Sequence, residues 1–161
     1  MVYVLAGFVS IALIVVIVGL ARAARGALRD LENLDHAISR LLELQDPRIS
    51  LVIRECVGPR FLQFRMSELV KGEEGVELWL TDAGWMEGFR ARIIAESEIK
   101  GLKTRVVVVP EQGAYLVVSL GCDKNMAADF GRDILINEAG LEPNDKVRVR
   151  FDVHKAMKAG T

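Results

Sequence analysis

The sequence predicts an α+β fold in which a single N-terminal transmembrane helix continues into a helical stalk, followed by a largely antiparallel sheet with one covering helix. The apolar run up to Ala21 carries no charge, the next segment keeps a helical spacing up to Pro47, and the remainder alternates as strands do, apart from one helical segment. The expected parts are an anchor at 1–21, a stalk at 22–47, an α+β domain at 48–154 and a tail at 155–161.

Composition limits the function classes. The chain has 161 residues, enough for one domain of ordinary size and a short extra element. Lys plus Arg (21) nearly balance Asp plus Glu (22), so charge gives no reason to expect nucleic acid as a partner. Two cysteines are too few for a secreted module held together by disulfides.

Residues 2–21 have the length and apolar character of a membrane span. About 20 helical residues at 1.5 Å each match the roughly 30 Å hydrocarbon core of a bilayer. Ala21-Arg22-Ala23 also has the small-x-small pattern of a signal-peptidase site. The run is longer than a secretory apolar region, however, and no positive side chain precedes it, which favours an uncleaved anchor.

The first positive charges follow the span. By the positive-inside rule, Arg22, Arg25 and Arg29 remain in the cytoplasm and contact the membrane surface. We therefore expect a protein of the inner (cytoplasmic) membrane, with its N-terminus outside and its C-terminal domain in the cytoplasm.

The stalk carries an apolar stripe. A 3-4-3-4-3 spacing places these residues on one helical face: Ala24, Ala27, Leu31, Leu34, Ile38 and Leu41. Leu28, Leu42 and Leu44 widen the face. A wide stripe is more typical of a helix packed on its own domain than of a dimeric coiled coil, and both interpretations stay open.

Beyond Pro47 the pattern changes to strands. Segments 48–56, 60–66 and 76–82 alternate apolar and polar residues, and "AGWMEGF" reads as a glycine-rich turn. Segment 90–99 is predicted as a further strand, with a short helix as the alternative.

The C-terminal half of the domain begins with a predicted hairpin, 104–110 and 114–120, whose four consecutive valines suggest a strand covered on both faces. A helix follows, capped by Asp123 and terminated by Gly140. The last strand, 146–153, alternates cleanly. Its inward residues are Val147, Val149 and Phe151, and its outward residues are Arg148, Arg150 and Asp152.

The sequence carries no catalytic constellation. It has no phosphate-binding glycine loop, and His36 and His154 have no second ligand at helical spacing. Cys122, at the expected start of a helix, is the least implausible reactive group but has no assignable histidine base. We expect no catalytic residue, no metal and no cofactor, and hence no enzyme.

Exposed aromatic and arginine side chains are the candidate partner-binding residues, because these residue types anchor protein interfaces. The set is Phe61, Trp79, Trp85, Arg60 and Arg65. The alternative is that a helix covers the face of the sheet that carries Phe61 and Trp79, which makes both of them core residues.

Phe61, Gln63 and Phe64 in "RFLQF", together with the later "NEAGLEP", resemble type III secretion chaperone-like domains, a bacterial group that includes the YbjN-like and tyrosine-rich chaperone-like families. The resemblance covers residues 28–141. It implies a non-enzymatic domain that binds another polypeptide. The membrane anchor and the added final strand depart from that pattern.

The expected function is therefore a non-catalytic, single-pass accessory or assembly subunit of a larger membrane protein complex. Its transmembrane helix and cytoplasmic domain would bind integral membrane protein partners. The alternative is a self-associating scaffold, a homo-oligomer held by its stalk, or a chaperone-like binding module.

Overall fold

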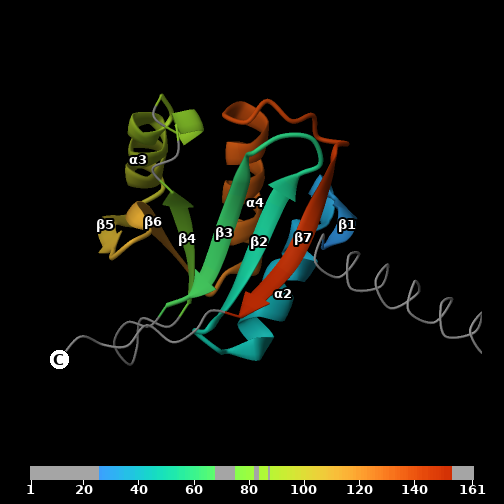
Figure 1. The fold of residues 1–161 in the computed structure, drawn as a ribbon, viewed down its shortest axis with the longest axis horizontal. Helices are drawn as coiled ribbons and strands as arrows, with labels where there is room; N and C mark the ends of the chain where they lie inside the picture. Colours follow the sequence, from blue (N-terminus) through green and yellow to red (C-terminus); the bar gives the residue numbers. More distant parts are fainter. Residues whose placement is uncertain (1–25, 68–74, 82–83, 87, 154–161) are drawn as a thin grey trace, which may run out of the picture.

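The computed structural model describes residues 26–67, 75–81, 84–86 and 88–153. Seven strands and three α-helices follow one another in these ranges (Figure 1). The strands are β1 (Ala27–Asp30), β2 (Ile49–Glu55), β3 (Phe61–Met66), β4 (Val76–Thr81), β5 (Lys103–Val109), β6 (Gly113–Gly121) and β7 (Lys146–Val153). The helices are α2 (Leu34–Leu44), α3 (Arg90–Ile99) and α4 (Lys124–Asn137), with short 3-10 turns at η1 (Leu31–Asn33) and η2 (Gly84–Met86).

All seven strands form one open antiparallel sheet, ordered β1-β7-β2-β3-β4-β6-β5. Helices α2 and α4 lie behind β2, β3 and β7 in Figure 1, while α3 lies at the end of β4 and β5. No helix of the described ranges covers the side of β2, β3 and β7 that faces the viewer. The predicted α+β class with an antiparallel sheet is confirmed.

The stalk is not one helix. Residues 27–30 form β1, which pairs with β7 and opens the same sheet. Gly26 takes φ +80°, and a Cβ there would lie 2.7 Å from the Val149 carbonyl oxygen, so the chain passes too close to β7 for a helix. Sheet pairing overrides the helix propensity of "ALRD" at 27–30. Farther along the predicted stalk, η1 leads into α2, which is followed by Gln45 in the left-handed region.

The predicted anchor at 1–21 lies outside the described residues, as do Arg22 and Ala24. Among the helices that the structure does describe, none is long and apolar enough to cross a membrane.

The apolar stripe of α2 packs on the domain to which it belongs. Leu31, Leu34, Ile38 and Leu41 are all fully buried in the main core, together with residues of α4 and of the sheet. The predicted packing of this helix on its own domain is therefore confirmed. Leu28 does not join the stripe, because it lies on β1 with 51% of its surface exposed.

Segment 90–99 is a helix, so the predicted strand is wrong and the alternative is right. Ile93 and Ser97, four residues apart, are the buried positions of α3, and the Ser97 hydroxyl donates to the Ile93 carbonyl oxygen at 2.7 Å. In a strand, Ala95 would share the face of Ile93 and Ser97, but it is exposed, so the pattern needs helical periodicity.

Two further expectations about strand faces are wrong. The valine-rich strand β5 is the last strand of the sheet, and Val106 and Val108 are 54% and 73% exposed. Phe151 is also exposed, although Val147 and Val149 of the same strand are buried as expected.

Helix α4 matches its prediction. The Asp123 carboxylate accepts backbone N–H bonds from Asn125 (2.9 Å) and Met126 (3.2 Å), and Gly140 takes φ +69° after the helix. Phe130, Ile134 and Leu135 are buried against the sheet. Together with α2, this helix closes one face of the sheet, whereas no helix of the described ranges lies over the other face at β2, β3 and β7.

Candidate functional site

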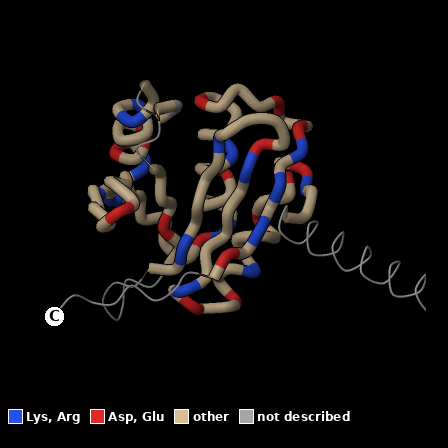
Figure 2. Tube along the Cα trace, in the orientation of Figure 1, with Lys and Arg blue, Asp and Glu red and all other residues tan. Residues whose placement is uncertain are grey.

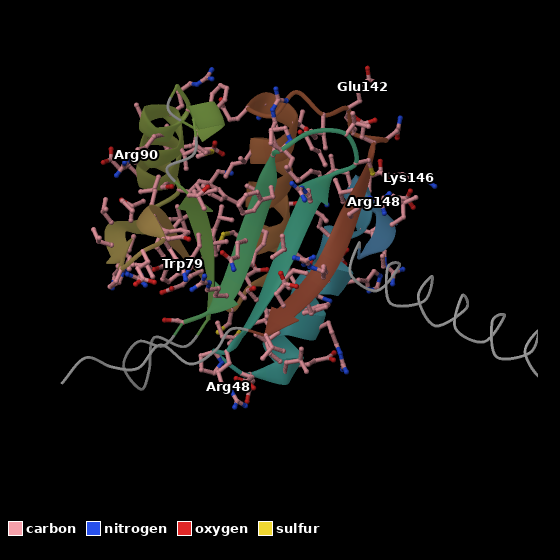
Figure 3. All side chains as sticks on the ribbon, in the orientation of Figure 1. Arg48, Trp79, Arg90, Glu142, Lys146 and Arg148 are labelled. Atoms are coloured by element: carbon pink, nitrogen blue, oxygen red, sulfur yellow. The ribbon has the colours of Figure 1, made fainter. Side chains whose placement is uncertain are left out.

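The face of the sheet opposite α2 and α4 carries three of the candidate partner-binding residues, Phe61, Arg65 and Trp79. In an antiparallel sheet, residues paired across strands point to the same face. The register therefore places two rows on this face: Leu28, Arg148, Arg54 and Phe61, and beside them Arg150, Val52, Gln63, Trp79 and Val117. Figure 3 shows Arg148 near β1 and Trp79 at the other side of the sheet.

Trp79 is a packed residue of this face. Only 8% of it is exposed, and it forms a small cluster with Val109, Tyr115 and Val117. Its ring meets the Tyr115 ring edge-on at 5.5 Å, a favourable aromatic geometry. The expected exposure of Trp79 is therefore not seen, although the covering element is not a helix.

Arg65 covers Trp79. Its guanidinium carbon lies 4.2 Å from the indole centroid, and Arg65 is itself buried. Glu77, the cross-strand partner of Arg65 on β4, is only 2% exposed. Its carboxylate accepts hydrogen bonds from Trp79 Nε1 at 3.1 Å and from the Arg105 guanidinium at 2.9 Å. This polar network ties β3, β4 and β5 together on the open side of the sheet.

Arg60 and Phe61 begin β3. Arg60 donates to the Ala139 carbonyl oxygen, and its guanidinium lies 3.9 Å from the Glu55 carboxylate, which also accepts from the Arg60 backbone N–H at 3.1 Å. Arg60 is thus engaged within the fold. Phe61 is half-buried and lines a cavity.

Of the other predicted residues, only Arg29 is described in full. Trp85 belongs to η2, and its side chain is outside the described set. Arg25, like Arg22, falls in the undescribed N-terminal range, and Arg29 is exposed on β1, opposite Val147. Of the five candidate partner-binding residues, Phe61, Arg65 and Trp79 lie on the same face of the sheet, and Arg60 is bonded to Ala139 and Glu55.

A cavity of about 610 Å³ opens on the face over β7, β2 and β3. Apart from Glu55 at the end of β2, its residues share one side of these strands or lie in the turn beside them: Val52, Arg54, Cys56, Gly58, Phe61, Gln63, Arg148, Arg150 and Asp152. Figure 2 shows the basic positions that follow one another along β7. This volume is in the range of pockets that take small ligands or inserted side chains.

Sequence reasoning missed the arginines of this cavity. Arg148 and Arg150 were expected to point outward, and they do, but nothing in their spacing places Arg54 beside them. Arg150 is paired with Asp152, with its Nε 2.6 Å from the carboxylate. Arg54 and Arg148 have no carboxylate partner among the residues described.

The two thiols occupy different places. Cys56 lines the cavity and donates to the Lys146 carbonyl oxygen at 2.9 Å. Cys122 is exposed beside the start of α4. Within the described ranges, no group of His, Cys, Asp and Glu side chains is arranged to hold a metal ion.

No protein-family model matches this chain, and no curated protein or solved structure matches it either. The resemblance to type III secretion chaperone-like domains stays a prediction. The geometry of the open face carries the functional argument.

Proposed function

We propose that this chain is a non-catalytic, single-pass protein of the inner (cytoplasmic) membrane and an accessory or assembly subunit of a larger membrane protein complex. Its α+β domain binds a polypeptide partner through the open face of the sheet. The observation that supports this function is the cavity over β7, β2 and β3, where arginine and aromatic side chains meet. Those residue types are enriched at protein interfaces.

The uncharged run at 2–21 supports the membrane location, and the arginines that follow it support a cytoplasmic domain. In the described domain, β1 begins at Ala27, so only a few residues separate the run from the sheet. An extended residue spans at most about 3.6 Å, so the domain stays within roughly 20 Å of the bilayer. A partner in the same membrane is therefore within reach of the open face.

A scaffold that dimerises through its stalk is less well supported. The residues that such a coiled coil needs at its seam, Leu34, Ile38 and Leu41, are fully buried in the domain's own core. Self-association of the chain would have to use another surface.

The function is tested by purifying the full-length chain, tagged after Thr161, from its native membrane in mild detergent and identifying what comes with it by mass spectrometry. We expect a stoichiometric set of integral membrane proteins. Phe61→Ser and Arg148→Glu should each deplete that set. Arg40→Glu is the matched control, because Arg40 is an exposed residue of α2 on the other layer. Recovery of the chain alone, or only as a homo-oligomer, would contradict the proposal.

The location is tested separately. The intact mass should include residues 1–21, whereas a cleaved signal would remove them. Both cysteines are exposed, so they report on sidedness. A membrane-impermeant maleimide should label them in inverted vesicles and leave them unlabelled in intact spheroplasts. The opposite pattern would place the domain outside.

A further inference from the structure

We propose that the cavity binds an acidic segment of the partner protein, with its carboxylates held between Arg54 and Arg148 and its apolar side chains lying against Phe61 and Leu28. This inference rests on the proposed function and names the chemistry of the segment that the open face takes.

The argument starts from two like charges placed side by side. Arg54 of β2 and Arg148 of β7 are direct partners in the antiparallel register, so their side chains leave the same face of the sheet next to each other. Like charges in directly opposite positions repel each other. A carboxylate bound between them would remove that repulsion and accept hydrogen bonds from both guanidinium groups.

The neighbouring cations already have partners. Arg150 pairs with Asp152, Arg105 with Glu77, and Arg60 with Glu55. Both carboxylates that line the cavity, Glu55 and Asp152, are therefore engaged. Within the described part of the chain, Arg54 and Arg148 are left without a counter-charge, and the ligand that complements this cavity is an anion.

The apolar neighbours of the two arginines indicate that the ligand carries apolar groups as well as negative charge. Leu28 lies opposite Arg148 on β1 and is 51% exposed, and Phe61 lies opposite Arg54 on β3. Four adjacent strands thus present an apolar, a cationic, a second cationic and an apolar side chain in one row. Strands lie about 4.8 Å apart, so the row is roughly 14 Å long.

An extended polypeptide matches this row. At about 3.3 Å per residue, four or five residues cover the distance, with one or two acidic residues in the middle and an apolar residue at each end. A bilayer surface is flat, whereas this site is a hollow of about 610 Å³ with a half-buried aromatic ring in its wall. The hollow favours an inserted segment over a layer of lipid headgroups.

The test uses the full-length chain in nanodiscs of phosphatidylcholine, whose headgroups carry no net charge. The probe is a dye-labelled, acetylated peptide amide of sequence Leu-Glu-Glu-Leu, followed by fluorescence anisotropy. Leu-Gln-Gln-Leu is the control peptide. We expect the acidic peptide to bind at least about tenfold more tightly, as charge-assisted hydrogen bonds predict, and to weaken as salt rises.

The variants locate the binding. Arg54→Gln and Arg148→Gln should each weaken the acidic peptide about tenfold or more, and Arg40→Gln on α2 should not change it. The double variant Arg54→Glu, Arg148→Glu should lose the acidic peptide and instead prefer Leu-Lys-Lys-Leu. A reversal of preference cannot come from unfolding, so it supports the site even where a single variant is destabilised.

Three results would overturn the inference: equal affinity for the acidic and amide peptides, equal binding by the Arg54→Gln and wild-type chains, or displacement of the peptide by glycerol 3-phosphate at lower concentration than by free glutamate. The last result would assign the site to a lipid headgroup. The proposed function fails differently. If membrane partners are recovered with Arg54→Gln and Arg148→Gln but lost with Phe61→Ser, the face binds a partner and only the acidic chemistry is wrong.

Discussion

Helix α4 touches the sheet through a glycine, and this contact gives a sharp test of the core. Gly131 lies in the middle of α4 and is buried. A Cβ placed on it would lie 2.7 Å from Cζ of Phe64 and 3.5 Å from Cε2. Phe64, on β3, has no exposed surface, so its ring has no open space into which to move.

The substitution Gly131→Ala therefore sets two effects against each other. Alanine is favoured over glycine in a helix interior by about 1 kcal/mol. Overpacking a filled core costs about 1–3 kcal/mol. With the contact at 2.7 Å and the ring fully enclosed, we expect the clash to exceed the gain, and the free energy of unfolding to fall by about 1 kcal/mol.

The assay is urea denaturation of the full chain in mild detergent, followed by tryptophan fluorescence. The midpoint should decrease at an unchanged slope, which indicates a loss of stability rather than a change of the surface exposed on unfolding. Phe64→Leu shortens the ring that meets the new Cβ, so it forms the second edge of a double-mutant cycle. We expect Gly131→Ala to be harmless or stabilising in the Phe64→Leu background.

An increase in stability of Gly131→Ala in the wild-type background, near the 1 kcal/mol of helix propensity, would refute the reasoning. It would mean that α4 does not approach β3 as closely as the distances indicate. Simple additivity of the two substitutions would lead to the same conclusion.

Four further predictions concern single interactions. Asp123→Ala should cost about 1 kcal/mol of unfolding free energy, because it removes the cap of α4, whereas Asp129→Ala on the exposed side of the same helix should change stability little; urea titration compares them. Arg105→Met removes the guanidinium that pairs with the buried Glu77 carboxylate and should lower the free energy of unfolding, measured by urea titration, by about 2 kcal/mol. Adding Glu77→Leu should recover part of that loss. Arg54→Thr removes one of two opposed positive charges and should raise the midpoint of urea unfolding by the equivalent of at most about 1 kcal/mol. Hydrogen bonds from the Arg48 side chain and backbone lower the pKa of Asp46 from 3.8 to about 2. The stability that this pair adds is therefore present above pH 4 and lost as the pH falls towards 2. Carboxylate chemical shifts should show this low midpoint for Asp46 in the full chain, and a return towards the ordinary value in Arg48→Ala.

The strands of the domain are the part of the fold that periodicity predicts well. β2, β3, β4 and β7 all fall within segments predicted as strands from their apolar and polar pattern, and β6 matches the second arm of the predicted hairpin to within one residue at each end. Alternation is a local property, and a strand with one buried face must show it. The cap and the terminator of α4 are equally local, which is why Asp123 and Gly140 could be placed from the chain alone.

The errors occur where a distant element decides the structure. Residues 27–30 contain good helix formers, yet they pair with β7, which follows more than a hundred residues later. The valines of β5 predict burial on both faces, but the strand is the last of the sheet, and Val106 and Val108 are 54% and 73% exposed. Neither the pairing partner nor the edge position is encoded within the segment itself.

The candidate site was also predicted only in part, because the environment of each residue depends on neighbouring strands. Trp79 and Phe61 could be recognised as residues of the face opposite the core, because each alternates with buried neighbours within its own strand. Their different environments depend on the strands beside them: Tyr115 and Val117 of β6 enclose Trp79, while Phe61 faces a cavity. Exposure on a sheet face is thus set by the cross-strand neighbours and not by the strand that carries the residue.

The pair formed by Arg54 and Arg148 follows from the same principle. Each arginine alone reads as an ordinary outward residue of an alternating strand, and 94 positions separate them in the numbering. Only the antiparallel register of β2 and β7 makes them direct neighbours, with Leu28 and Phe61 on either side. Opposed like charges weaken a sheet, so a fold that keeps them on an open and hollowed face is consistent with a use for the charge outside the domain. That use is recognition of an anion, and the apolar residues at both ends of the row make an acidic polypeptide segment the ligand that fits it best.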